Sequence, residues 1–259
     1  KLKGTGDLAT AAARLEELVA TFPESPLADD GLLVLGEVYE AQQQWGEAQA
    51  TYQLLLEQCP DSPLLGQVQE RLGDVNVAVL WSPVVTARDA VYQVQSGDTL
   101  SGIATASGTT VEYLKKANGL TGDLIRPHQK LKVPKGRFSI VVDRSQRQLL
   151  LTSDNQFIKT YLVSIGANDA TPLGTFQVVN KIVEPVWYKQ GAVVPPESPE
   201  NILGTRWLGI NKTSYGIHGS VDPEQIGQAV TAGCVRMTNP DVEELFDLVP
   251  VGTEVTIVD

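Results

Sequence analysis

The sequence predicts a multidomain protein in which an α-helical repeat is followed by a small α+β module and then by a mainly β domain. Apolar residues within residues 1–80 recur at helical spacing, and parts of this stretch repeat after 37 positions. Residues 91–135 read as strand, helix, helix and strand, whereas strand-like alternation dominates after residue 136. We therefore expect domains over residues 1–82, 91–135 and 136–259, with a linker over residues 83–90.

The charge balance changes at nearly the same places. Residues 1–80 carry 4 basic and 13 acidic side chains, residues 81–136 carry 7 and 4, and residues 137–259 carry 9 and 14. The net charge of −11 argues against binding to duplex nucleic acid, which needs a basic surface. No apolar run approaches the roughly 18 residues that a membrane-spanning helix requires.

Cysteine and histidine are scarce, with 2 residues of each type. This number excludes a disulfide framework and a zinc site built from cysteines alone, and it leaves little room for a histidine-rich metal centre. We therefore expect neither a metal ion nor a cofactor. Catalysis by these residue types depends on four candidates, which are Cys59, Cys234, His128 and His218.

The first module contains the internal repeat. The segment Phe22–Leu27 matches Cys59–Leu64, and Leu35-Gly36 matches Leu72-Gly73, at the same offset of 37. Cys59 ends a predicted helix just before Pro60, and we expect it to pack as an apolar residue.

The same module resembles the tetratricopeptide repeat, with a period three residues longer than the usual 34. The residues that carry this resemblance are Leu35-Gly36-Glu37-Val38-Tyr39, Ala48 and Tyr52. The small Gly36 and Ala48 would let paired helices approach closely, with Tyr39 and Tyr52 filling the space between them. Two functions stay open, namely a surface that binds a partner protein and a packing spacer.

The second module has the order strand, helix, helix, strand. The predicted elements are a strand at Val91–Val94, helices at Leu100–Ala106 and Val111–Ala117, and a strand at Lys130–Pro134. The module resembles a LysM domain over its whole length, in Tyr92-Gln93-Val94-Gln95-Ser96-Gly97-Asp98-Thr99-Leu100-Ser101-Gly102-Ile103-Ala104, Leu114, Asn118 and Ile125–Pro134.

The resemblance to LysM domains implies binding to glycans that contain N-acetylglucosamine, such as peptidoglycan. The positions that correspond to the glycan site lie in two loops and are Gly97, Asp98, Thr99, Leu100, Leu124 and Ile125. His128 stands where the family usually has glycine, so we expect a turn residue there.

The third module is predicted to be mainly β. The predicted strands are Phe138–Val142, Gln148–Leu151, Phe157–Ser164, Thr175–Asn180, Trp207–Ile210, Tyr215–His218 and Glu254–Val258. Proline after Asp222 and Asn239 indicates two helix starts, leading to helices over about 223–230 and over Val242–Leu248. The Pro-rich stretch Glu184–Thr205 is predicted to be a long loop that acts as a lid or as a wall of the acceptor site.

Two of the four candidates can meet in this module. His218 ends a predicted strand, and Cys234 follows a predicted helix, so a short loop could return its sulfur to the strand end. An imidazole beside a thiol can take its proton and later return it to a leaving amine. Main-chain N–H groups around Cys234 could stabilise an oxyanion, and Arg236 could bind a substrate carboxylate.

The surrounding residues resemble those of the YkuD-type L,D-transpeptidases. The motif is carried by His218-Gly219-Ser220 and Thr231-Ala232-Gly233-Cys234-Val235-Arg236, with upstream matches in Thr171–Phe176 and Gly204–Leu208. The resemblance implies a β-sandwich-like catalytic domain that cuts a peptidoglycan stem peptide after its third residue. Cys234 would hold the acyl group as a thioester and pass it to an amine, either for 3-3 cross-linking or for attachment of a protein.

The resemblance also assigns roles to individual residues. The expected catalytic residues are Cys234 and His218, with the Gly219 carbonyl or the Ser220 hydroxyl as the partner of the imidazole. The expected substrate-binding residues are Arg236, Gly233, Trp207 and Tyr188.

One position departs from the family motif, because Ala232 replaces the histidine that usually precedes Gly-Cys. His218 is therefore the single imidazole of the third module. Two alternatives stay open, a non-catalytic peptidoglycan-binding scaffold and an L,D-carboxypeptidase. In each case the partners are peptidoglycan strands and stem peptides. The chain begins at Lys1 without Met and without a leader, so we expect that an upstream segment was removed. The implied function predicts an exported protein of the periplasm or cell wall.

Overall fold

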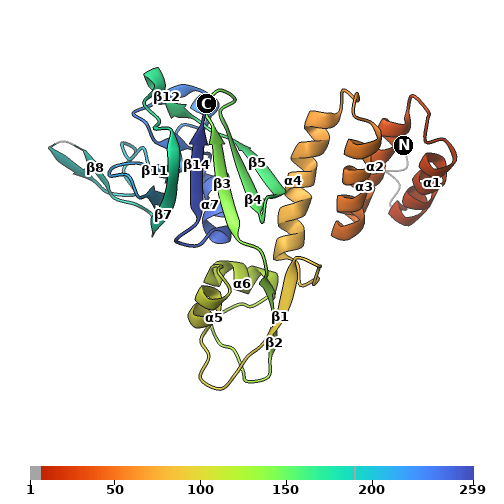
Figure 1. Cartoon of the computed structure of the whole chain (residues 1–259), viewed down its shortest axis with the longest axis horizontal. Coiled ribbons are helices and arrows are strands. Elements are labelled where there is room, and N and C mark those ends of the chain that lie inside the picture. Colours follow the sequence, from red (N-terminus) through yellow and green to blue (C-terminus); the bar gives the residue numbers. More distant parts are fainter. Residues whose placement is uncertain (1–6, 190) are drawn as a thin grey trace. The chain divides into compact units, whose positions relative to one another are not determined.

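The computed structural model describes residues 7–189 and 191–259 and divides into two compact units, Lys1–Ser82 and Pro83–Asp259 (Figure 1). The first unit holds the helical repeat. The second holds the α+β module and the mainly β domain. Among the described residues, no helix combines the length and apolar character needed to cross a membrane.

The described part of the first unit consists of four helices. These are α1 (Leu8–Thr21), α2 (Ala28–Ala41), α3 (Trp45–Gln58) and α4 (Leu65–Trp81). The starts of α1 and α3, and of α2 and α4, lie 37 positions apart, which confirms the predicted helical repeat. The two long connections also match, because the hydroxyls of Ser25 and Ser62 accept hydrogen bonds from the N–H groups of Leu27 and Leu64.

The contact between α2 and α3 depends on one glycine. A Cβ atom at Gly36 would collide with the ring of Tyr52, whose side chain is fully buried. The Tyr52 hydroxyl donates a hydrogen bond to Glu40, and Arg71 of α4 pairs with Glu40 and with Glu37 at 3.3 and 2.6 Å. Gly36 thus lets the two helices approach and leaves room for the ring of Tyr52.

Replacement of Gly36 by alanine is expected to lower the stability of this unit by about 1–2 kcal/mol. The cost of overpacking exceeds the roughly 1 kcal/mol that alanine gains in helix propensity. Gly66→Ala in α4 is the control, because a Cβ atom there meets nothing within 4 Å. Hydrogen exchange of α2 and α3 in the full chain measures the opening free energy. An unchanged value in the Gly36 variant would contradict this packing.

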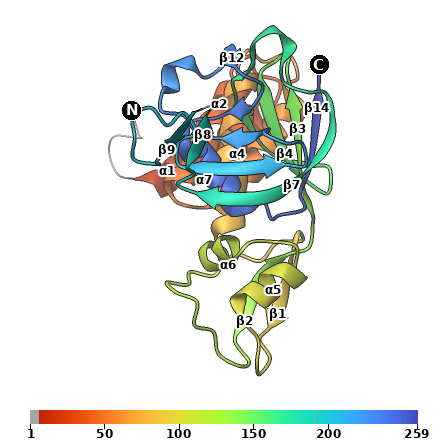
Figure 2. The ribbon, with the colours of Figure 1, turned by 90° about the vertical axis from the view of Figure 1, so that its left-hand side faces the viewer.

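The α+β module has the predicted order of elements. It contains β1 (Asp89–Gln93), α5 (Leu100–Ala106), α6 (Val111–Ala117) and β2 (Lys130–Pro134), with β1 and β2 paired antiparallel. The helices pack on one side of the β1–β2 pair (Figure 2). Both helices are capped by threonines, because the hydroxyls of Thr99 and Thr110 accept from the N–H groups of Gly102 and Tyr113.

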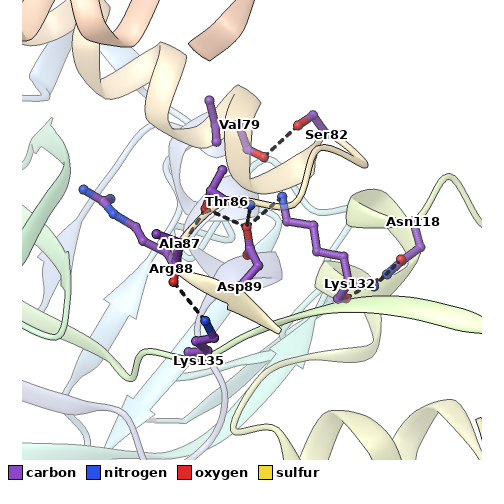
Figure 3. A network of polar contacts seen from close by, with 9 residues as sticks. All are labelled: Val79, Ser82, Thr86, Ala87, Arg88, Asp89, Asn118, Lys132 and Lys135. Carbon is purple, nitrogen blue, oxygen red and sulfur yellow. Dashed lines mark hydrogen bonds and ion pairs between the residues drawn. The ribbon is translucent and has the colours of Figure 1, made fainter. Parts of the chain in front are cut away.

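A buried ion pair joins the first and the last strand of this module (Figure 3). Lys132 Nζ lies 3.6 Å from the carboxylate of Asp89, and each side chain is 2% exposed. Burial lowers the pKa of Lys132, and the charge of Asp89 opposes that shift. The backbone N–H and the hydroxyl of Thr86 donate to Asp89 at 2.8 and 2.7 Å, and Asn118 bonds to both backbone groups of Lys132. The network joins the preceding linker to both strands.

The mainly β domain is built on a curled sheet. Its strands are β3 (Phe138–Asp143), β4 (Gln148–Ser153), β5 (Gln156–Leu162), β7 (Gly174–Val183), β10 (Arg206–Ile210), β11 (Gly216–His218), β13 (Val235–Arg236) and β14 (Glu254–Val258). Among the described residues these strands form one eight-stranded sheet in the order β13-β11-β10-β7-β14-β3-β4-β5, rather than two separate sheets. The pairs β14–β3 and β11–β13 are parallel, and the other neighbours are antiparallel.

Helix α7 (Asn239–Leu248) lies against this sheet (Figure 1). Lys181 of β7 donates to the carbonyls of Phe246 and Val249 at the carboxyl end of the helix, at 2.5 and 2.9 Å. Glu244 of α7 accepts from Tyr161 of β5 at 2.8 Å. The helix therefore contacts strands that are far apart in the strand order, as it must where the sheet curls round it.

Three parts of this domain differ from the sequence prediction. The helix expected over about 223–230 is wrong, because the 3₁₀ turn Pro223–Gln225 is followed by Gly227 at φ 88° and by the short strand β12 (Ala229–Thr231). β12 pairs in parallel with β6 (Ile165–Gly166). The predicted loop Glu184–Thr205 contains an antiparallel hairpin of β8 (Trp187–Lys189) and β9 (Ala192–Val194).

Candidate active site

The parallel pairing of β11 with β13 brings the two candidate catalytic residues together. His218 lies opposite Arg236 in this register, and Ile217 lies opposite Val235. Cys234 comes directly before β13, and its side chain lines the same cavity as those of His218 and Arg236. Strand pairing thus places both residues around one cavity, and the returning helix that the sequence suggested is absent from the described residues.

A tight turn presents Cys234. The Thr231 hydroxyl donates to the Cys234 carbonyl at 2.7 Å and accepts from the N–H of Gly233 at 3.1 Å. Gly233 has φ 131°, and a Cβ atom there would lie 2.6 Å from the ring of Tyr215 and 2.8 Å from the carbonyl oxygen of Ala170. The conformation of this turn therefore explains the spacing Thr-x-Gly-Cys. The N–H of Gly233 is already hydrogen-bonded within the turn.

His218 is buried, with 3% of its surface exposed, and its environment fixes its protonation. Nδ1 lies 2.7 Å from the carbonyl oxygen of Gly219, and a carbonyl only accepts, so Nδ1 carries the hydrogen. Burial lowers the pKa of His218 to about 4, and the charge of Arg236 adds to this shift, whereas the carbonyls of Gly219 and Leu203 oppose it. The imidazole is therefore neutral at pH 7, with Nε2 available as a base. Trp207 stacks on the ring at 5.9 Å between centroids.

The Gly219 carbonyl, and not the Ser220 hydroxyl, is the group that contacts this imidazole. The Ser220 hydroxyl donates to the carbonyl of Asp222 at 2.9 Å and accepts from its N–H at 3.0 Å. The sequence left both partners open, because the direction of a serine hydroxyl depends on the turn that follows it.

Cys234 is held as a thiol. Its Sγ lies 3.6 Å from the carbonyl oxygen of Ser214, to which it donates. Burial raises the pKa of the Cys234 thiol, and a hydrogen bond from the N–H of Gly216 partly opposes this. The thiol therefore needs a base before it can attack a carbonyl carbon.

Arg236 is oriented by a chain of polar contacts. Its Nη2 donates to Gln225 Oε1 at 2.9 Å, and Gln225 Nε2 donates to the carboxylate of Asp222 at 2.5 Å. Its Nε is buried and has no hydrogen-bond partner among the described residues, and the side chain lines the cavity described next. Gln225 was not predicted as a site residue from the sequence, because the 3₁₀ turn Pro223–Gln225 is what directs its side chain to Arg236.

These side chains share one cavity of about 630 Å³. Cys234, His218 and Arg236 line it from the sheet, and Tyr188 lines it from the β8–β9 hairpin. The remaining lining residues are mostly apolar and include Trp187, Ile202, Leu203, Trp207, Val230 and Ala232. A cavity with an apolar wall and a few converging polar groups is the usual form of a small-molecule or peptide site.

The α+β module has a smaller hollow of about 370 Å³ between its two predicted glycan loops. Five of the six predicted residues, Asp98, Thr99, Leu100, Leu124 and Ile125, line it. Gly97 lies beside it at φ 92°, and Leu124 is 80% exposed. His128 has φ 69°, a left-handed turn conformation that glycine adopts most easily.

The alkylation rate of Cys234 by iodoacetamide is expected to rise roughly tenfold per pH unit between about pH 6 and 8.5. The reason is that burial raises the thiol pKa, so that the thiolate fraction is still increasing over this range. A Cys59→Ser background removes the second free thiol. A rate that stays constant between pH 6 and 8 would instead indicate a preformed thiolate–imidazolium pair.

Comparison with known families divides the chain in the same order as its sequence patterns. Residues 137–257 match the model of the L,D-transpeptidase catalytic domain, and residues 92–134 match that of the LysM domain. Residues 2–72 match the model of the tetratricopeptide repeat.

Curated relatives match about two thirds of the chain. A putative L,D-transpeptidase YkuD of Bacillus licheniformis is 37% identical over 175 residues, covering 64% of this chain and 98% of the relative. The protein of the same name from Bacillus subtilis is 34% identical over 173 residues, covering 64% and 97%. Among solved structures, the catalytic domain of an L,D-transpeptidase from E. faecium aligns over 47% of this chain and 96% of that chain, with 25% identity and a TM-score of 0.40.

Proposed function

Because the chain belongs to the YkuD family of L,D-transpeptidases, we propose that Cys234 is its nucleophile, with His218 as the general base and acid. The observation that carries this assignment is that Cys234, His218 and Arg236 line one cavity, with His218 paired to Arg236 in the β11–β13 register. The substrate is a peptidoglycan stem peptide, cut after its third residue.

The first half-reaction acylates the enzyme. Nε2 of His218 takes the proton from Cys234 as Sγ forms a bond to the carbonyl carbon of the third residue. The tetrahedral intermediate then collapses, the C–N bond to the fourth residue breaks, and His218 returns the proton to the leaving amine. A thioester on Cys234 and a neutral imidazole remain.

The second half-reaction transfers the acyl group. An acceptor amine, from a second stem peptide or from a protein, attacks the thioester carbon and gives its proton to His218. The C–S bond breaks, and the proton passes to the departing sulfur, which regenerates the thiol. Water in place of the amine would make the enzyme a carboxypeptidase.

Arg236 binds a carboxylate of the substrate in this scheme. Gln225 and Asp222 orient the guanidinium, whose N–H groups other than the one bonded to Gln225 would donate to a ligand oxygen in the cavity. Trp207, Tyr188 and the apolar wall bury the peptide next to Cys234.

The LysM module holds the enzyme on its polymer. Glycan binding between residues 98–101 and 123–125 raises the local concentration of stem peptides without any new contact in the active site. This substrate places the protein outside the cytoplasm, at the cell wall or in the periplasm. The helical repeat is a separate surface for a partner protein or a spacer.

Intact-protein mass spectrometry with a stem tetrapeptide, and in parallel with a carbapenem, tests this function. The expected result is one adduct per chain on Cys234, with release of the fourth residue from the peptide and a cross-linked product in the presence of an amine. A folded protein that binds insoluble peptidoglycan but forms no adduct would be a scaffold, as Ala232 would suggest. A hydrolysed tripeptide as the sole product would identify a carboxypeptidase.

A further inference from the structure

The side chain of Asn239 ties two active-site loops to the start of α7. Its Oδ1 accepts a hydrogen bond from the N–H of Ser220 at 3.1 Å and another from the N–H of Thr205 at 3.2 Å. Ser220 follows directly on His218-Gly219, and Thr205 begins the approach to β10, which carries Trp207. One amide oxygen thus holds both the loop that follows His218 and the residue that precedes β10.

The bond to Ser220 reaches the imidazole through a single peptide group. The N–H of Ser220 and the carbonyl of Gly219 belong to the same planar unit. That carbonyl oxygen lies 2.7 Å from Nδ1 of His218. Asn239, the peptide and the imidazole therefore form a continuous chain of hydrogen bonds, which we call the Asn239 relay.

Two glycines make room for the relay. A Cβ atom at Gly219 or at Gly204 would collide with Asn239 Oδ1. Gly204 also has φ 64°, but Gly219 has no positive φ that would require glycine. At Gly219 the close approach of the asparagine oxygen is thus the local reason for glycine.

We propose that Asn239 is a positioning residue that fixes the tautomer of His218. By accepting from the Ser220 N–H, it holds the plane of the Gly219–Ser220 peptide and polarises the Gly219 carbonyl toward Nδ1. The hydrogen then stays on Nδ1, and Nε2 keeps the lone pair that removes the proton from Cys234. This role rests on the proposed function of His218 as the base.

The helix cap does not depend on Asn239. Thr238 caps α7, because its side chain accepts from the N–H of Asp241 at 3.2 Å. Replacement of Thr238 by alanine therefore weakens the start of the helix and leaves the relay intact. This separates a positioning role of Asn239 from a general contribution to α7.

The test compares three variants of the full chain. Asn239→Leu is similar in size but has no acceptor, Asn239→Asp keeps an acceptor oxygen, and Thr238→Ala is the control. Carbapenem acylation of Cys234 is expected to slow roughly 10- to 100-fold in the leucine variant, the loss that follows removal of a partner orienting a histidine at metal sites. The aspartate and Thr238→Ala variants should stay within about threefold of the unmodified chain.

The tautomer is read directly from ¹⁵N shifts of the imidazoles, of which the sequence has 2. His128→Gln assigns them. His218 of the unmodified chain is expected to carry its hydrogen on Nδ1 at pH 7, and the leucine variant should show a mixture. A hydrogen on Nε2 in the unmodified chain would overturn the proposal, whether or not the leucine variant folds. An unchanged tautomer and rate in that variant, or an equal loss in Thr238→Ala, would overturn it as well. The NMR readout needs no substrate, so it separates failure of the relay from failure of the proposed function.

Discussion

Serine in place of Cys234 is expected to abolish thioester formation and to lower acyl transfer by at least about 10⁴-fold. The hydroxyl of serine is a much weaker acid than a thiol, and the cavity holds one neutral imidazole rather than a set of groups that would activate an alcohol. Intact-protein mass after incubation with a carbapenem measures the adduct, and product analysis with a stem tetrapeptide measures transfer.

Cys59→Ser is the matched control for this experiment. Cys59 follows α3 as its C-cap residue, in the unit of residues 1–82, and has its own thiol pKa raised by burial and by nearby carboxylates. This variant should form the same adduct as the unmodified chain. An adduct that persists in Cys234→Ser and disappears in Cys59→Ser would refute the assignment of the nucleophile.

Local sequence signals predicted the helices of the small module well. The bounds expected for α5 and α6 agree with those in the structure, because threonine caps begin both helices and glycine or asparagine follows them. The period of 37 likewise predicted the helical repeat. In the small module the capping residues lie within one turn of each helix end, whereas in the repeat the signal is the match between residues 37 positions apart.

Short strands were missed because tertiary pairing creates them. β6, β12 and β13 have two or three residues each, and each is a strand only through a neighbour from a distant part of the chain. Pro223 begins a 3₁₀ turn instead of the predicted helix, and the turn ends at Ile226, whose backbone is extended. The spacing of apolar residues does not predict where such a turn ends.

The residue types of the candidate site were predictable from the motif, but their geometry was not. The sequence singled out Cys234, His218 and Arg236, and the structure places all three around one cavity. Gln225 and Asn239 were not singled out, because both act through turns whose form only the fold decides.

The absence of a second imidazole at Ala232 is consistent with a neutral resting pair. Burial lowers the pKa of His218 and raises that of Cys234, so both shifts oppose formation of an ion pair before substrate binds. One buried imidazole with a fixed tautomer can then serve both half-reactions, since it starts and ends each of them neutral.

Glutamine in place of His218 is expected to reduce acylation of Cys234 by about 10²- to 10⁴-fold at pH 7, the usual contribution of a general base. The glutamine amide can still donate to the Gly219 carbonyl but cannot take a proton from the thiol. His128→Gln, which changes a turn of the small module, is the control and should acylate at the normal rate. Equal rates in His218→Gln and the unmodified chain would show that the base lies elsewhere.

The same substitution changes how stability depends on pH. His218 is neutral when folded down to about pH 4, whereas its ordinary pKa in an unfolded chain is near 6.5. The unfolded state therefore binds more protons between these values, and the free energy of unfolding of this domain falls by about 3 kcal/mol as pH decreases from 6.5 to 4. Above about pH 7.5 this histidine contributes almost no pH dependence, because it is then neutral in both states. His218→Gln lacks this part of the loss, so opening free energies from hydrogen exchange of β10 and β11 should depend less on pH in the variant. Identical pH dependence in both chains would mean that His218 binds a proton equally well in the folded and the unfolded state. That result would contradict its assignment as a neutral base.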